Sequence, residues 1–329
     1  MRKNSISILL AVCMIFVSAG FVDAAPRDPV FIEWGGAAVG SAVNSAMTAM
    51  SEAVNRHSDY IRANIQATAG TSAHYLMFKN GLIDIGSGSG FGDMEAWHGG
   101  TAMFPEPIQV WRTIAVFSRN FQTVIVRADS GIYTMNDLNG RTIGIGPAGA
   151  PTSGMALGTL NSLGIQAANL LHSTIVEQIE LYIDGRVDAI ILTSPGGNAN
   201  VLNAFNSVPS RLISLTEEEM QKIEEGDLRG KSARDVLTNE FYSFIPPGEA
   251  INVMNDHSSV NVLATMDDQV VFDILDAYWS QHEELRATIG ILTGLPEHIL
   301  MATTYIHPGA ARYYREVWNI DIPSERILR

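Results

Sequence analysis

Apolar and polar residues alternate along the chain in blocks that predict strands and helices in turn. Short apolar runs predict strands at residues 30–34, 62–68 and 82–85. Between the first two runs, apolar residues recur at helical spacing from Val43 to Val54, and a second helix should end at residues 80–81. Short connections of this kind predict a parallel-type sheet covered by helices on both faces.

A second group of units begins at residue 121. Strands are predicted at residues 121–127, 141–145 and 185–192, and the last of these is similar in sequence to residues 81–85. That similarity indicates two related lobes. The predicted first lobe comprises residues 25–122 and 250–329, and the predicted second lobe comprises residues 123–249.

The chain should return to the first lobe after residue 250. We expect residues 251–262 to form a strand or loop that makes this return, and residues 266–289 to form one amphipathic helix. The acidic segment 216–241 predicts a solvated face.

The first 24 residues have the pattern of a secretory signal peptide. Arg2 and Lys3 precede an apolar stretch and small residues that fit cleavage before Ala25. The stretch is shorter than the roughly 20 residues of a membrane-spanning helix, which disfavours a permanent anchor. Cys13 lies inside it without a preceding small residue, which disfavours lipidation. Cleavage would leave a chain without cysteine, which excludes disulfides and thiolate chemistry.

The charge composition restricts the possible partners. Asp and Glu number 35 against 21 Lys and Arg, and the formal net charge is −14. Such a field repels nucleic acid and anionic membrane surfaces. An anionic ligand would therefore need local backbone amides or one well-placed arginine.

One glycine-rich segment matches a dinucleotide-binding pattern. Residues Gly144-Ile-Gly-Pro-Ala-Gly149 fit G-x-G-x-x-G, but Pro147 and Pro151 stiffen the turn. No acidic residue follows about 20 positions later to bind a ribose. The loop is better interpreted as backbone amides at a helix start, where a carboxylate gains about 0.3 to 1 kcal/mol from the helix dipole. We expect no cofactor.

Catalytic and metal-binding patterns are weak. The sequence has no G-x-S-x-G, H-E-x-x-H or Gly-Lys-Ser phosphate-loop motif. The histidines lack partner spacing, which predicts surface or packing roles for His57, His74, His98 and His172. We expect no catalytic residue and no metal site.

Several charged residues still need a role. Carboxylates near the predicted cleft, at Glu33, Asp93 and Glu95, could do acid–base work in an enzyme. Asp84 and Asp188 are expected to accept backbone hydrogen bonds at helix-to-strand turns rather than to bind metal. Arg112 lies among apolar residues, where it should pair with a carboxylate of the sheet or, alternatively, contact a ligand.

Five segments resemble the solute-binding proteins of tripartite ATP-independent (TRAP) transporters, specifically the TAXI family. Ala67-Thr-Ala-Gly-Thr-Ser72 is similar to the family's T-G-G-S turn, and His307-Pro-Gly-Ala-Ala-Arg-Tyr-Tyr-Arg-Glu316 is similar to its H-P-G-A-x-R-Y-Y-x-E ending. The other similar segments are residues 126–132, 137–147 and 183–189. The resemblance runs from Ile32 to about Trp318.

This resemblance implies an α/β fold of the periplasmic binding protein type II-like class, with two lobes of mixed sheets flanked by helices and joined by a hinge. It also implies a monomeric periplasmic receptor that captures a small-molecule solute and delivers it to a fused membrane permease subunit. The chain departs from the family where specificity is set. Residues 33–43 lack two aromatics and gain Trp34, and residues 86–90 read Gly-Ser-Gly-Ser-Gly where Q-S-D is common.

The predicted site is a crevice between the lobes that closes on a small carboxylate-bearing solute, such as an amino acid or organic acid. Trp34 should cover an apolar side of the solute, and closure should exclude water and strengthen each hydrogen bond. The expected ligand-binding residues are Trp34, Gly35, Gly36, Ala37, Thr71, Ser72, Ser87, Gly88 and Ser89 in the first lobe and Gly149, Thr152, Ser153, Thr193 and Ser194 in the second.

Two alternative functions are compatible with this pattern. One is a secreted sensor domain that presents a bound solute to a receptor. The other is a secreted enzyme on the same scaffold, with Glu33 or Asp93 as the base.

Overall fold

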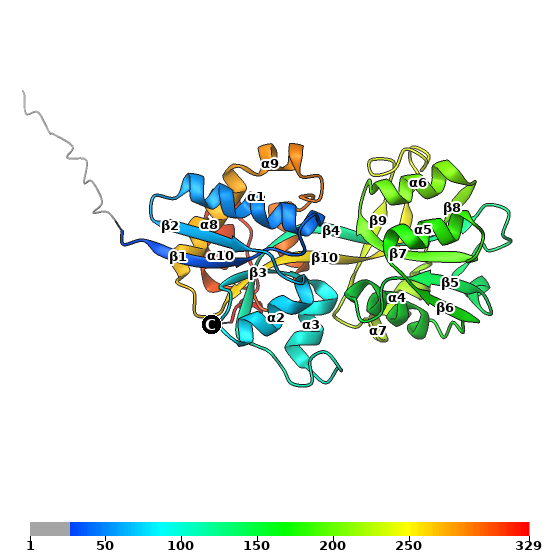
Figure 1. The fold of residues 1–329 in the computed structure, drawn as a ribbon, viewed down its shortest axis with the longest axis horizontal. Coiled ribbons are helices and arrows are strands. Elements are labelled where there is room, and N and C mark those ends of the chain that lie inside the picture. Colours follow the sequence, from blue (N-terminus) through cyan, green and yellow to red (C-terminus); the bar gives the residue numbers. More distant parts are fainter. Residues whose placement is uncertain (1–26, 329) are drawn as a thin grey trace, which may run out of the picture.

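Two long antiparallel strands connect the two lobes of the protein (Figure 1). The computed structural model describes residues 27–328. Within that range β4 (Trp111–Arg127) and β10 (Ile251–Leu263) lie at the centre of a ten-stranded sheet. The sheet runs in the order β2-β1-β3-β10-β4-β7-β5-β6, with β8 paired to β4 and β9 paired to β10. The expected mixed sheets of the two lobes are therefore one continuous sheet that passes through both.

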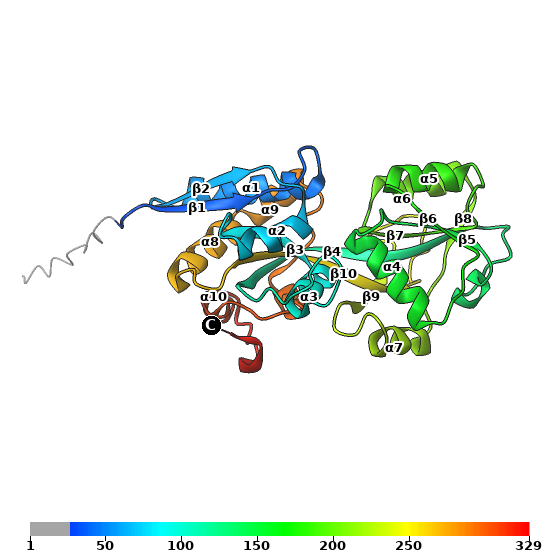
Figure 2. The ribbon, with the colours of Figure 1, turned by 60° about the horizontal axis from the view of Figure 1, so that its bottom comes forward.

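The first lobe combines the start and the end of the chain (Figure 2). Its strands β1, β2 and β3 are parallel where they pair with one another, and helices cover both faces. Its elements are β1 (Val30–Gly35), α1 (Ala42–His57), β2 (Ile61–Gln66), α2 (Thr71–Lys79), β3 (Ile85–Ser89), α3 (Gly90–His98), α8 (Asp268–Ser280), α9 (His282–Thr288), η2 (Pro296–Met301), α10 (Pro308–Trp318) and η3 (Ser324–Arg326).

The second lobe is built from the middle of the chain and repeats the strand–helix pattern. Strand β5 pairs in parallel with both β6 and β7. Its elements are η1 (Met135–Leu138), β5 (Thr142–Ile145), α4 (Pro151–Ser162), β6 (Asn169–His172), α5 (Ile175–Ile183), β7 (Ala189–Pro195), α6 (Ala199–Ser207), β8 (Ser210–Leu212), α7 (Glu217–Glu225) and β9 (Ala233–Leu237).

Buried apolar clusters show where the connecting strands pass from one lobe to the other. On β4, Phe117 packs in the core of the first lobe and Phe121 in a core of the second. On β10, Met254 packs in the second lobe and Val260 in the first. Both strands thus belong to both lobes, and the predicted boundaries at residues 122/123 and 249/250 stay predictions.

The glycine-rich segment after residue 85 is a strand rather than a loop. The sequence predicted a strand at residues 82–85, but β3 spans Ile85–Ser89 and α3 follows immediately. The segment is buried between neighbours that approach it closely: a Cβ atom on Gly86 would lie 3.0 Å from His74, and one on Gly88 would overlap Asp93. Small residues are therefore required at this position. Because β3 lacks the apolar side chains from which a buried strand is predicted, the sequence did not indicate it.

The helix predicted over residues 266–289 is two helices. The chain leaves helical geometry at Gln281 (φ −108°, ψ 1°), which ends α8 and precedes α9. The Gln281 side-chain amide donates to the Ala53 and Ala277 carbonyls at 3.1 and 2.8 Å. After this turn, α9 buries His282 and Leu285. These residues extend the apolar pattern of α8 in the sequence, although they belong to a separate helix.

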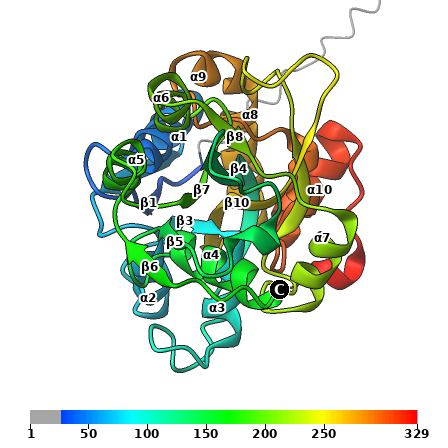
Figure 3. The ribbon, with the colours of Figure 1, turned by 90° about the vertical axis from the view of Figure 1, so that its right-hand side faces the viewer.

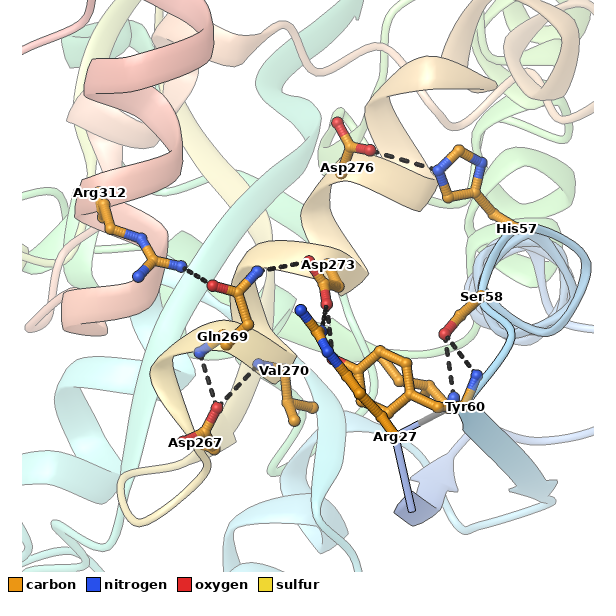
Figure 4. Close-up of polar contacts among 11 residues, drawn as sticks. Arg27, His57, Ser58, Tyr60, Asp267, Gln269, Val270, Asp273, Asp276 and Arg312 are labelled. Carbon is orange, nitrogen blue, oxygen red and sulfur yellow. Dashed lines mark hydrogen bonds and ion pairs between the residues drawn. The ribbon is translucent and has the colours of Figure 1, made fainter. Parts of the chain in front are cut away.

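Polar contacts tie α8 to the residues just before β1 and β2 and to α10 (Figure 4). Asp273 accepts from Arg27 Nη1 at 2.7 Å and from the Tyr60 hydroxyl at 2.5 Å. Gln269 donates to the other Asp273 oxygen at 2.7 Å and accepts from Arg312 at 2.7 Å. Exposed ion pairs of this kind contribute about 0–1 kcal/mol, so they orient α8 more than they stabilise it.

Part of the acidic segment 216–241 forms a capped helix with buried residues, in addition to the predicted solvated face. Thr216 and Glu219 form a capping box at the start of α7, and Met220 and Ile223 on that helix are buried. Arg234 pairs with two carboxylates of α7. Only part of this segment is therefore a solvated face.

The predicted signal peptide, residues 1–24, which includes Cys13, lies outside the described residues. Within residues 27–328, no helix is both long and apolar enough to cross a membrane.

Replacing Gly88 tests the close packing of β3. In Gly88→Ala the new methyl group would overlap Asp93 and the two side chains that donate hydrogen bonds to it, Asn261 and Ser259. We expect the free energy of unfolding in urea to fall by about 3 kcal/mol. Gly290→Ala is the matched control, because no heavy atom lies within 4 Å of its new Cβ. It should change stability by about 0.5 kcal/mol or less, and equal effects of the two substitutions would contradict this packing.

Candidate functional site

The parallel strands of each lobe end where the connecting strands pass between the lobes. Ser89 of β3 pairs with Ser258 of β10, and Pro195 of β7 pairs with Asn120 of β4. Seen along the long axis, β4 and β10 run through the middle of the molecule (Figure 3). The carboxyl ends of β1, β3, β5 and β7 therefore point toward the opposite lobe. Ligands of open α/β sheets bind at such carboxyl ends.

A cavity of about 440 Å³ lies between the two lobes. The first lobe contributes the start of α2, the face of α3 and the loop that follows α3, and the second contributes the start of α4 and the end of β6. The lining residues are Ser72, Phe91, Glu95, Thr101, Ala102, Met103 and Phe104 from the first lobe and Gly149, Ala150, Pro151, Ser153, Gly154, Leu157 and His172 from the second.

Three of the predicted ligand-binding residues line this cavity: Ser72, Gly149 and Ser153. Gly149 has φ +77°, which favours glycine at the turn before α4. Thr152 and Thr193 instead line a small cavity of about 50 Å³ within the second lobe. Ser194 is buried on β7 and lines neither cavity.

Trp34, which was predicted to cover the solute, does not line this cavity. Its side chain is 1% exposed and packs with Ile32 in the first core, because both residues point to the same face of β1. The turn after it also uses its own amides: Gly36 donates to the Gln66 carbonyl at 2.9 Å and Ala37 to Asn44 Oδ1 at 3.1 Å. Gly35 lies against His74. These residues shape the end of β1 and do not line the cavity.

The remaining predicted hydroxyls hold α2, β3 and α3 together. Thr71 and Ser87 hydrogen-bond through their hydroxyls at 3.0 Å, and the Ser87 amide donates to His74 Nδ1 at 3.0 Å. Ser89 caps α3 by accepting from the Gly92 amide at 3.1 Å. Thr71, Ser87, Gly88 and Ser89 thus support the cavity wall from behind.

Buried carboxylates anchor α3 to β10. Asp93 accepts from the Tyr75 hydroxyl, Ser259 and Asn261 at 2.7 to 2.8 Å. Burial raises the pKa of Asp93 to about 6, although these three hydrogen bonds act in the opposite direction. Asp256 accepts from the Phe91 amide at 3.0 Å, and burial raises its pKa to about 7. Asp93 is therefore a structural group and does not line the cavity.

The other two carboxylates considered from the sequence differ in position. Glu33 is on the exposed side of β1, where it accepts from Asn64 at 3.0 Å. Glu95 lines the cavity and pairs with Lys231 of the second lobe at 3.8 Å. Burial raises the pKa of Glu95, and Lys231 partly offsets this effect.

Phe91 joins the lobes on one side of the cavity. It belongs to a core cluster of the second lobe, and a Cβ atom on Gly154 of α4 would lie 2.6 Å from its ring. The Lys231 ammonium lies 4.8 Å from the centre of the same ring. Gly154 therefore has to be small for Phe91 to pack against α4.

Asp84 and Asp188 accept backbone hydrogen bonds at helix-to-strand turns, as predicted, and they do so at equivalent places in the two lobes. Asp84 accepts from the Glu33 amide of β1 at 2.8 Å, and Asp188 accepts from the Thr142 amide of β5 at 2.8 Å. Each aspartate precedes a strand and ties it to its parallel neighbour. Within residues 27–328, no group of three or more His, Cys, Asp or Glu is placed to hold a metal ion.

Arg112 is directed away from the cavity. It donates to the carbonyls of Leu328, Gln109 and Trp111 at 2.7 to 2.8 Å, and its guanidinium lies over Trp97. A carboxylate of the sheet as its partner stays a prediction. Ligand contact has no support here, because Arg112 does not line the cavity.

Sequence reasoning missed several cavity residues. The sequence predicts a surface or packing role for His172, and it predicts no role at the site for Phe91, Met103, Phe104 or Leu157, all of which line the cavity. The glycines at residues 99–100 and 149, which flank the lining segments, were the usable signal, because they mark turns.

The two lobes and the sheet that joins them form an α/β fold of the periplasmic binding protein type II-like class. Among solved structures, a TctC solute-binding protein from Polaromonas matches with a TM-score of 0.58 and 12% identity, covering 90% of this chain and 100% of that one. A periplasmic sulfonate-binding protein from Methylobacillus flagellatus KT matches with a TM-score of 0.50 and 12% identity, covering 92% of each chain. Identities this low show the fold alone.

The chain belongs to the NMT1-like family, which it matches over residues 35–317. No curated protein matches the sequence closely enough to count as a relative.

The pH dependence of stability tests the buried carboxyl of Asp256. Its pKa is about 7 in the folded protein and about 4 in an unfolded chain, so the folded state binds more protons between these values. The free energy of unfolding should therefore fall as pH rises from about 4 through 7, by on the order of 4 kcal/mol.

Asp256→Asn keeps the acceptor for the Phe91 amide and removes the titration. Urea unfolding at pH 4.5, 6 and 7.5 should give a smaller fall for this variant than for the wild type. Parallel curves for the two proteins would show that Asp256 does not titrate in this range.

Proposed function

We propose that the protein is the extracytoplasmic solute-binding receptor of a TAXI-type TRAP transporter. It captures a small carboxylate-bearing solute, an amino acid or organic acid, and delivers it to a fused membrane permease. The observation that carries this proposal is the cavity of about 440 Å³ lined by both lobes. Its size falls within the roughly 300–1,000 Å³ of small-molecule sites.

The connecting strands support binding by closure. Only β4 and β10 carry the sheet between the described lobes, and their pairing shifts register between Ser258 and Ser259 and again between Val260 and Asn261. Such irregularities bend strands. A solute favours the closed state by the difference between its affinities for the closed and open states.

The start of α4 supports a carboxylate at one end of the solute. Gly149 and Ser153 line the cavity at the start of this 12-residue helix, and Ser72 lines it from the start of α2. The positive end of a helix dipole stabilises an anion by about 0.3–1 kcal/mol. This local field would act against the overall charge of −14.

The transporter type rests on the sequence segments that resemble the TAXI family, above all residues 307–316. Export to the periplasm, a monomeric state and a permease partner belong to the same proposal. A neighbouring gene for a fused permease would distinguish this receptor from a sensor domain.

An enzyme on this scaffold is the weaker alternative. Neither Glu33 nor Asp93, the two bases considered, lines the cavity. Glu33 lies on the exposed side of β1, and the Asp93 carboxylate is buried and accepts hydrogen bonds from Tyr75 and other side chains. Glu95 alone of the three carboxylates lines the cavity, and it is paired with Lys231. An enzyme would convert a bound acid to product, whereas the proposed receptor releases it unchanged.

Thermal unfolding in the presence of candidate acids tests the receptor function. A solute at 100 times its Kd should stabilise the protein by about 2.7 kcal/mol, which raises Tm by about 5 °C. Ser72→Trp should abolish this rise by filling the cavity, and the ligand-free Tm should change little because Ser72 is partly exposed at the start of α2.

Ser45→Trp is the matched control for that substitution. Ser45 lies near the start of α1, is exposed and does not line the cavity, so the stabilisation by solute should persist. An unchanged response in Ser72→Trp would place the solute elsewhere.

A further inference from the structure

Apolar side chains make up most of the cavity surface. Half of the 14 lining residues are apolar and carry a side chain: Phe91, Ala102, Met103, Phe104, Ala150, Pro151 and Leu157. Among the described residues that line the cavity, there is no Lys or Arg. A solute that fills this volume must therefore place much of its surface against carbon.

The apolar wall is held in position from outside the cavity. Phe104 packs edge-on against Tyr75, with ring centres 5.5 Å apart. Phe91 is fixed by the hydrogen bond from its amide to Asp256 and by the approach of its ring to Gly154. The wall is thus preorganised for an apolar body, and a polar solute would lose hydration without gaining hydrogen bonds from it.

Glu95 is the acidic group of the same wall. Its carboxylate lies 3.8 Å from the Lys231 ammonium, and both side chains are about one quarter exposed. Lys231 is not among the residues that line the cavity, although its ammonium lies 4.8 Å from the centre of the Phe91 ring. An anionic group of the solute that lies near Glu95 would meet a carboxylate, with no Lys or Arg of the lining beside it.

We propose that the solute is an apolar monocarboxylate, with an aliphatic or aromatic body and one acidic group, and that Glu95 excludes dicarboxylates. This inference rests on the proposed receptor function and narrows its solute class. The apolar wall selects the body of the acid, and Glu95 selects against a second carboxylate.

Hexanoate and adipate provide a matched pair of probes, since they have the same six carbons and differ in the second carboxylate. Isothermal titration of the purified full-length chain should show at least tenfold tighter binding of hexanoate. Butyrate should bind about 15-fold more weakly than hexanoate, because it lacks two methylenes and each buried methylene changes affinity roughly fourfold.

Two variants test the residues that the inference names. Glu95→Gln should reduce the preference for hexanoate over adipate severalfold, whereas Glu106→Gln, at an exposed carboxylate outside the cavity, should leave it unchanged. Met103→Gln should weaken hexanoate binding severalfold without harming the fold, because Met103 is 43% exposed. Leu82→Gln is its control, since Leu82 is 56% exposed and lies outside the cavity.

The outcomes separate the inference from the function on which it rests. Equal or tighter binding of adipate, or of glutamate, would overturn the inference and leave the receptor function standing. An unchanged preference in Glu95→Gln would overturn the role of Glu95. Failure of every acid in the panel to bind would overturn the receptor function and the inference together.

Discussion

The antiparallel pairing of β4 with β10 is the constraint on which the rest of the structure depends. Each strand contributes apolar residues to the cores of both lobes, so neither lobe is complete without them. Their pairing also sets where the parallel strands of each lobe end, because β3 pairs with β10 and β7 pairs with β4 near the crossing. The cavity between the lobes is a consequence of this arrangement.

Buried polar groups transmit the position of β10 to the cavity. Asp256 on β10 holds the start of α3, and Asp93 on α3 is held in turn by Ser259 and Asn261 of the same strand. Phe91, at the start of α3, then reaches the second lobe. A change in the bend of β10 would therefore move a residue that lines the cavity, which couples the hinge to the site.

The alternation of strands and helices could be predicted because the apolar periodicity is visible in the sequence, as in α1 and β2. Strand β3 could not be placed, since its burial depends on glycines and serines packed against His74 and Asp93. At the site, turn residues identified Ser72, Gly149 and Ser153. Phe91, Met103 and Leu157 could not be identified, because an apolar residue that faces a cavity looks in sequence like one that faces a core.

The distance between the lobes tests closure on a solute most directly. Spin labels at Val39→Cys, after β1 in the first lobe, and at Val176→Cys, at the start of α5 in the second lobe, would report the distance between the lobes from side chains that are 83% and 53% exposed. The only native cysteine, Cys13, lies in the predicted signal peptide. We expect a saturating solute to shorten the distance between the two labels and to narrow its distribution. A distribution unchanged by a solute that binds would contradict closure.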